Sequence, residues 1–118
     1  DLVAALDARK GQVIWAVFRV NKGIPQPLQF TQLTSPETWL EQIPSSSLVL
    51  GSACGAYAEM LKSRDDLQVL GGEFCRPRAA HIARLGYRAS RSKQGMKWQQ
   101  VRPDYVRPAD VQVHAGGA

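Results

Sequence analysis

Cys54, which lies between two glycines, is the first candidate for a chemically active residue. Cys54 follows the apolar run Leu48–Leu50, within Gly51-Ser52-Ala53-Cys54-Gly55, and precedes a helical pattern. The first turn of a helix presents unpaired amides, which bind anions and lower the pKa of a thiol. The motif lacks the Lys-Ser or Lys-Thr of a phosphate-binding P-loop. We therefore favour a tight strand-to-helix turn in which the cysteine packs as a small residue.

A cysteine nucleophile also needs a base, and the sequence offers two histidines. His81 falls within a predicted helix and His114 in a Gly- and Ala-rich tail, so spacing brings neither to Cys54. Zinc sites usually contain pairs of ligands a few residues apart in the sequence. The two histidines, Cys54 and Cys75 form no such pair. No pair of carboxylates indicates acid–base catalysis. We expect no catalytic residue and no metal ligand here, and a cysteine hydrolase using Cys54 is the least favoured alternative.

A basic segment in the last third of the chain is the remaining candidate. Between Arg76 and Arg107, Asp104 is the only acidic residue. Trp98 lies in a polar context, where it could stack on a base. Such a segment binds phosphates in a salt-sensitive way, although arginines also serve protein interfaces and solvated helix faces. The residues that we predict to contact RNA or a protein partner are Arg84, Arg88, Arg91, Lys93 and Lys97.

The overall composition is that of one globular domain. The chain has 118 residues, of which 44% are hydrophobic and 21% are charged, which excludes a disordered or collagen-like chain. No apolar run reaches the ~20 residues of a membrane span. The net charge of +5 permits a polyanionic partner, and two cysteines favour a reduced, cytoplasmic protein over a disulfide scaffold. Because Asp1 leads straight into a strand-like pattern, we expect a piece of a longer chain.

Strand-like and helix-like patterns alternate along the chain. Ser35 can cap a helix whose first position is Pro36, and Pro44 ends it. The pattern predicts an α/β fold in which three antiparallel strands precede a helix/strand alternation. The predicted strands are 2–6, 12–20, 26–33, 48–50 and 67–70, and the predicted helices are 36–43, 55–64 and 77–89. The residues that we expect in the core are Trp15, Phe18, Leu50, Tyr57, Leu61 and Ile82.

Two blocks of this sequence resemble a known family. The first is Ala5-Leu6-Asp7-Ala8-Arg9-Lys10-Gly11-Gln12-Val13-Ile14-Trp15-Ala16, which is similar to Ala-Ile-Asp-Ala-Arg-Met-Gly-Glu-Val-Tyr-Trp-Ala of the bacterial TsaB (YeaZ) family. The second is Arg102-Pro103-Asp104-Tyr105-Val106-Arg107, which is similar to the family's closing Pro-Val-Tyr-Leu-Arg. Between them, 48–53 and 77–85 resemble the family's strand with Gly-x-Gly and its last helix. All four blocks occur in the family's order, although Ala53 replaces the second glycine.

The resemblance implies one lobe of an actin-like ATPase (ribonuclease H-like) fold. It implies that 1–118 is a single domain, the C-terminal lobe of a two-lobed protein whose N-terminal lobe is absent, with 108–118 a flexible tail. Asp7, Arg9 and Gly11 would fix the first hairpin, and Tyr105 and Arg107 would tie the C-terminal segment to the domain. The residues that match family motifs, all in structural roles, are Asp7, Ala8, Arg9, Gly11, Trp15, Tyr105 and Arg107.

The resemblance also implies a function. Members of the family support synthesis of N6-threonylcarbamoyladenosine in tRNA, as non-catalytic partners of a TsaD-like paralogue that handles ATP and metal. A TsaE-like ATPase and, through the complex, tRNA are further implied partners, whereas no cofactor and no membrane are implied for this chain. The Arg-rich stretch 84–97 matches no family motif. A stand-alone basic RNA-binding module therefore remains the alternative.

Overall fold

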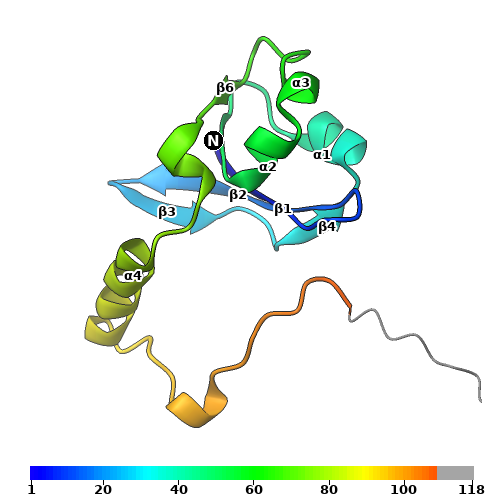
Figure 1. Cartoon of the computed structure of the whole chain (residues 1–118). Coiled ribbons are helices and arrows are strands. Elements are labelled where there is room, and N and C mark those ends of the chain that lie inside the picture. The colour runs from blue at the N-terminus through cyan, green and yellow to red at the C-terminus, as the bar shows by residue number, and fades with distance from the viewer. Residues whose placement is uncertain (109–118) are drawn as a thin grey trace, which may run out of the picture.

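A mixed sheet organises the protein, which we describe for residues 1–108 of a computed structural model (Figure 1). Strands β1 and β2 form an antiparallel hairpin whose register runs from the pair Leu2–Phe18 to the pair Asp7–Val13. Strand β5 pairs with β1 in parallel, and β6 pairs with β5 in parallel. The sheet order is β3-β2-β1-β5-β6, with β4 also paired to β2. The strands are β1 Leu2–Asp7, β2 Val13–Asn21, β3 Ile24–Pro27, β4 Gln32–Thr34, β5 Leu48–Leu50 and β6 Gln68–Val69.

Helices α1, α2 and α3 lie on one side of the sheet, and α4 stands away from its other side (Figure 1). The prediction of a mixed α/β fold is therefore confirmed at the level of class. The helices are α1 Pro36–Gln42, α2 Ser52–Ala56, α3 Ala58–Leu61 and α4 Ala79–Arg91, with short 3-10 turns η1 Gly72–Cys75 and η2 Trp98–Gln100.

Two predicted elements are wrong in detail. The single strand predicted over 26–33 is two short strands, β3 and β4, which pair with opposite ends of β2. Pro25 and Pro27 are tolerated because β3 is an edge strand, and its pairing ends with the hydrogen bond from the Leu28 amide to the Val17 carbonyl at 2.9 Å. The chain then leaves the sheet, with Phe30 94% exposed. The helix predicted over 55–64 begins earlier, at Ser52, and is interrupted at Tyr57, whose backbone is non-helical.

The core lies between the sheet and α1–α3. Alternate residues of β1 and β2 point into it, among them Val3, Ala5 and Trp15, because side chains alternate across a strand. From the helices, Trp39 and Leu61 pack against them. Trp15 and Leu61 were correctly predicted as core residues, and Tyr57 packs at the edge of the core. The prediction is wrong for Ile82, which is 63% exposed on α4, and Phe18 and Leu50 are only half-buried, on the opposite face of the sheet. The core residues are Val3, Ala5, Val13, Trp15, Val17, Trp39, Ile43, Val49, Ala53, Cys54 and Leu61.

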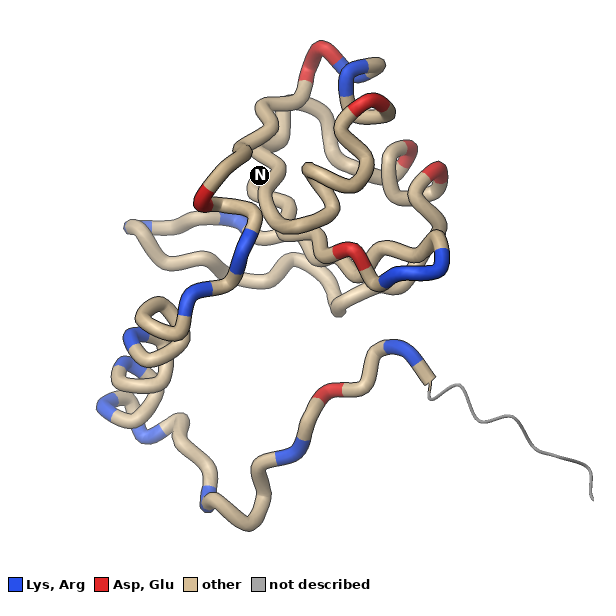
Figure 2. Tube along the Cα trace, in the orientation of Figure 1, with Lys and Arg blue, Asp and Glu red and all other residues tan. Residues whose placement is uncertain are grey.

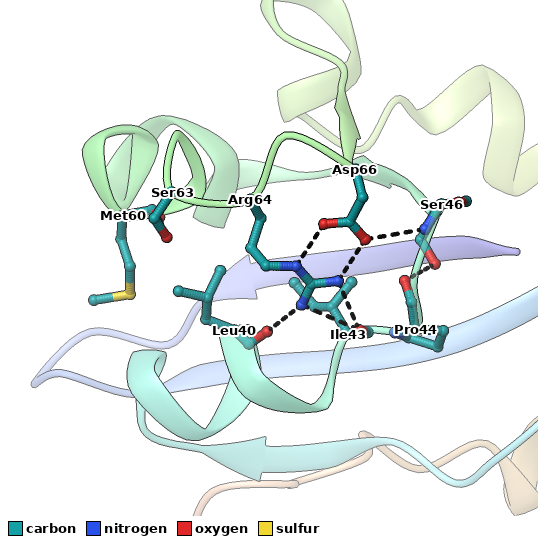
Figure 3. A network of polar contacts seen from close by, with 9 residues as sticks. Leu40, Ile43, Pro44, Ser46, Met60, Ser63, Arg64 and Asp66 are labelled. Atoms are coloured by element: carbon teal, nitrogen blue, oxygen red, sulfur yellow. Dashed lines mark hydrogen bonds and ion pairs between the residues drawn. The ribbon is translucent and has the colours of Figure 1, made fainter.

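Helix α1 is fixed at both ends by polar side chains. Ser35 Oγ accepts a hydrogen bond from the Thr38 amide at 3.2 Å, which satisfies one of the free amides at the helix start. At the other end, Arg64 Nη1 donates to the carbonyls of Leu40 at 3.0 Å and Ile43 at 3.4 Å (Figure 3). Asp66 holds that guanidinium through two hydrogen bonds of 2.7 Å. Arg64 therefore joins the end of α1 to the loop before β6.

The Arg64–Asp66 pair makes stability depend on pH. The hydrogen bonds from Arg64 hold the pKa of the Asp66 carboxyl well below its usual range. Because the pKa is lower in the folded state, the pair stabilises the protein above the unfolded pKa of ~3.9, and this stabilisation is lost as the pH falls further. We expect Asp66→Asn to lower the melting temperature at neutral pH and the difference from wild type to shrink toward pH ~2. Thermal melts across this pH range measure the difference, and Asp65→Asn, at an exposed neighbouring carboxylate, is the control. A difference in melting temperature that stayed constant with pH would contradict the prediction.

Candidate functional site

The turn between β5 and α2 is built for packing rather than for nucleophilic chemistry. Cys54 is 4% exposed, and burial raises the pKa of its thiol to about 11. The thiol is therefore protonated at neutral pH and is a poor nucleophile. His81 lies on α4 and His114 lies outside the described residues. Within residues 1–108, no three His, Cys, Asp or Glu side chains are grouped as a metal site would require.

The β1–β2 turn uses the polar residues of the first family-like block. Asp7 Oδ1 accepts a hydrogen bond from the Arg9 amide at 2.9 Å, and the Ala8 amide donates to the Gln12 carbonyl at 2.9 Å. Arg9, Lys10 and Gly11 all have positive φ, between 49° and 66°. The Asp7 amide in turn donates to Ser52 Oγ at 3.0 Å, so this turn is joined to the start of α2.

These contacts separate the roles of Asp7 and Arg9. Because the carboxylate of Asp7 holds the turn, we expect Asp7→Ala to lower the free energy of unfolding by about 1 kcal/mol. Arg9 contributes its backbone amide to this bond and its side chain is exposed, so Arg9→Ala should change stability by no more than about 0.5 kcal/mol. Urea unfolding of both variants measures the difference. Equal losses would show that the Arg9 side chain supports the turn as much as the Asp7 carboxylate does, and would contradict this assignment.

The remaining family-like residues are Trp15 in the core and Tyr105 and Arg107 in the C-terminal segment. Trp15 is 2% exposed, and its Nε1 donates to Thr34 Oγ1 at 3.0 Å, which links β2 to β4. Arg107 Nη1 donates to the carbonyl of Ala8 at 2.9 Å, across a separation of 99 residues. The C-terminal segment is thus joined to the β1–β2 turn through Arg107, whereas the side chain of Tyr105 is 81% exposed. The tail predicted over 108–118 lies, after Pro108, outside the described residues.

The face of the sheet opposite the core is apolar and largely open. Ala4, Leu6, Ile14 and Phe18 point to this side, because they alternate with the core residues of β1 and β2. Within residues 1–108, no helix packs on this face as α1–α3 pack on the other. The face instead forms one wall of a pocket of about 440 Å³. We call the sheet side of this pocket the open face; it comprises Ala4, Leu6, Ile14, Ala16, Phe18 and Leu50.

Helix α4 forms the other wall of the pocket. Its apolar residues Ile82 and Leu85 line the pocket and are still 63% and 57% exposed. The residues Arg76 and Arg78 also line it, at the start of α4, and Arg78 pairs with Glu73 at 2.9 Å. The site is therefore an apolar pocket with cationic side chains at its rim, a composition typical of an interaction surface.

The structure brings together only part of the predicted basic set. Helix α4 continues to Arg91, so Arg84, Arg88 and Arg91 share one face of it. Arg91 also lies over the ring of Tyr87 at 5.8 Å. Lys93 follows the end of the helix and Lys97 precedes η2, so neither belongs to the arginine face of α4. Figure 2 shows the cationic residues gathered along α4 and spaced out along the segment that follows.

The open face was missed by the sequence analysis, although the sequence carries a signal for it. Strands covered on one face alternate apolar and polar residues, whereas strands covered on both faces are apolar throughout. In β1 and β2, Leu6, Ile14 and Phe18 are apolar at positions that point away from the core. This pattern predicts that a second layer covers the sheet.

Comparison with known proteins places this arrangement among YeaZ-like folds. No protein-family model and no curated protein matches the sequence. Among solved structures, an uncharacterized protein with similarity to peptidase YEAZ from Pseudomonas aeruginosa matches 90% of this chain, with a TM-score of 0.69 and 20% identity. YeaZ from Pseudomonas aeruginosa matches 88% of it, with a TM-score of 0.67 and 21% identity. The chain spans about half of each structure, 49% and 48% respectively.

This likeness establishes the fold, because it extends over about nine-tenths of the chain. At 20–21% identity it establishes the fold alone. Among the helices of residues 1–108, none combines the length and the apolar character that crossing a membrane takes.

Proposed function

We propose that this chain is the C-terminal lobe of a TsaB-like protein with an actin-like fold. In this proposal the whole protein acts in the cytoplasm as a non-catalytic accessory protein for N6-threonylcarbamoyladenosine modification of tRNA, stabilising and activating a TsaD-like partner. The observation that carries the proposal is the YeaZ-like fold over 90% of the chain. The two most specific family-like blocks also meet in space, because Arg107 of the last block binds the carbonyl of Ala8 in the first.

The polar groups of the described chain support an accessory role over a catalytic one. Asp7 holds the β1–β2 turn, Asp66 holds Arg64, and Cys54 is a buried, protonated thiol. Each of these groups serves the fold. The proposal therefore assigns ATP and metal to the TsaD-like partner, with a TsaE-like ATPase as a further partner. The contribution of this chain is a folded surface that the partners bind.

Incorporation of labelled threonine into tRNA tests the proposal. The reaction contains ATP, bicarbonate, an enzyme that forms threonylcarbamoyl-adenylate, a TsaD-like protein and a TsaE-like ATPase. It is run without further protein, with this chain, and with this chain extended by an N-terminal YeaZ-like lobe. We expect only the extended form to restore incorporation. The same extended form carrying Gly51→Ala, which should unfold the lobe, is the matched control. Failure of the extended form to restore incorporation would overturn the proposal.

The arginine face of α4 favours one second candidate, a basic RNA-binding module. Arg84, Arg88 and Arg91 lie along one helical face and are exposed. If this face binds phosphates, reversing all three charges should weaken tRNA binding and reduce the salt slope by about one for each residue. Lys62→Glu, on the other side of the sheet, is the matched control. Unchanged tRNA binding would exclude the module and leave the accessory role.

A further inference from the structure

The open face lacks the covering layer that its composition requires. Its residues Leu6, Ile14 and Phe18 are large and apolar, and Leu6 is 40% exposed. On α4, Ile82 and Leu85 are three positions apart, so they project from the same side of the helix, into the pocket. Both walls of the pocket thus present apolar side chains to a space of about 440 Å³. A gap of this kind is filled by apolar side chains of another element.

The backbone around the pocket indicates that this element is a helix rather than a strand. A peptide that binds as a strand needs an unpaired sheet edge. Here β1 is paired with β2 on one side and with β5 on the other, so the open face offers side chains only. A helix meets such a surface with apolar residues at i, i+3, i+4 and i+7.

The charges beside the pocket indicate that the element is acidic. Arg76 lines the pocket, and Arg88 follows Leu85 by three positions, which places it beside the apolar stripe of α4. Arg84, one turn before Arg88, projects away from the side of α4 that carries Ile82 and Leu85, so the charges beside the pocket are those of Arg76 and Arg88. The acidic residue at this rim, Glu73, is already paired with Arg78. A second copy of this chain, with the same cationic rim and a net charge of +5, would be repelled.

The position of α4 is defined from both ends of its segment. Before α4, the Gly51 amide donates to the carbonyl of Phe74 at 3.1 Å, which joins η1 to the sheet. After it, Arg107 binds the carbonyl of Ala8. The chain between these contacts passes along α4 and returns to the β1–β2 turn on the open side of the sheet (Figure 1). The pocket is therefore bounded by a segment that is joined to the domain at each end.

We propose that the pocket between the open face and α4 binds an amphipathic helix of a partner protein, with apolar anchors on the open face and acidic residues paired with Arg76 and Arg88. The partner is defined by this chemistry, and the inference goes beyond the role in tRNA modification. Its test uses no tRNA and no modification enzyme, so its failure is distinct from failure of the proposed function.

Binding of two labelled peptides to the whole chain tests the proposal. Both have Leu at i, i+3, i+4 and i+7; one carries Glu beside the Leu stripe and the other carries Lys at the same positions. We expect the Glu peptide to bind at least about tenfold more tightly at low salt, and less tightly as salt is added. Fluorescence anisotropy measures both affinities. Equal affinities, or no binding of the Glu peptide, would overturn the proposal.

Two pairs of substitutions locate the site. Ile82→Asp with Leu85→Asp should abolish binding of the Glu peptide, and Met96→Asp, at a side chain that is 65% exposed beyond the helix, should not. Arg76→Glu with Arg88→Glu should weaken Glu-peptide binding by about tenfold and favour the Lys peptide, whereas Lys62→Glu should have no effect. The substituted side chains are exposed, and circular dichroism verifies the fold of each variant. Unchanged binding in both the apolar and the charge-reversed variant would overturn the proposal.

The other occupants of the pocket are outcomes of the same experiments. Nuclear Overhauser effects between Leu85 and Phe18 in the free chain would show that α4 itself covers the open face, and the proposal would fail. Self-association in sedimentation that is lost in the Ile82→Asp, Leu85→Asp variant would assign the pocket to a second copy. If an RNA oligonucleotide bound this variant and wild type equally, and the Glu peptide did not bind, the arginine face of α4 would be an RNA-binding surface and the proposal would fail.

Discussion

Gly51→Ala is expected to unfold or nearly unfold the domain. A Cβ built at Gly51 would lie 2.0 Å from the carbonyl oxygen of Ala5, within the β1 backbone, and Gly51 has a φ of 111°. Backbone strain and overpacking each cost about 1–3 kcal/mol, so the combined loss should reach about 3 kcal/mol or more. For a domain of this size the melting temperature should fall by about 10 °C or more. Thermal unfolding by circular dichroism measures the fall.

Gly55→Ala is the matched control for this substitution. Gly55 lies four positions later, in α2, and a Cβ there meets no atom within 4 Å. Because alanine is the better helix former, Gly55→Ala should raise the free energy of unfolding by about 0.5–1 kcal/mol. The two glycine substitutions are thus expected to change the free energy of unfolding in opposite directions. If Gly51→Ala melted within a degree or two of wild type, the close packing of this turn on β1 would be refuted.

Trp39→Ala is expected to have the second large effect. Trp39 is fully buried, packs in the core, and contacts the ring of Tyr57 edge-on at a centroid distance of 6.3 Å. Removing a buried tryptophan costs about 3–5 kcal/mol, because the cavity left behind is only partly refilled. Such a loss is comparable to the whole stability of many domains. Urea unfolding followed by circular dichroism gives the value, or shows that no folded baseline remains.

Trp98→Ala tests whether this effect comes from burial. Trp98 lies in η2 and its side chain is 79% exposed. We expect a change in the free energy of unfolding within about 0.5 kcal/mol. Comparable losses for the two tryptophans would contradict the position assigned to Trp39. A further variant, Trp39→Phe, keeps an aromatic ring and removes the buried Nε1, which has no hydrogen-bond partner among the described residues.

Local signals in the sequence were read correctly where one short segment determines the structure. Ser35 and Pro36 start α1 because the cap and the fixed φ of proline act within one turn. The polar turn after β1 was placed between two strands, and Asp7 and Gly11 both lie in it. These features depend on residues that are neighbours in the chain, so tertiary context does not override them.

Other features depend on distant contacts and could not be predicted in this way. The break at Tyr57 accompanies its contact with Trp39, 18 positions earlier in the chain, which no periodicity reveals. The spacing of Ile82 and Leu85 correctly indicates an amphipathic helix, but it does not say which surface that helix faces. The open face is a similar case. Residues on both sides of β1 and β2 are apolar, and only the tertiary structure shows which side the helices cover.

The contact between Arg107 and Ala8 also has a consequence for folding kinetics. It closes a loop of nearly the whole described chain, and the entropic cost of closure grows with the logarithm of loop length. The hairpin of β1 and β2 involves a much shorter loop and can form first. The bond from Arg107 then forms on a sheet that is already complete. We therefore expect the segment that carries α4 to be a separate foldon, whose amides exchange by local opening while the sheet stays protected.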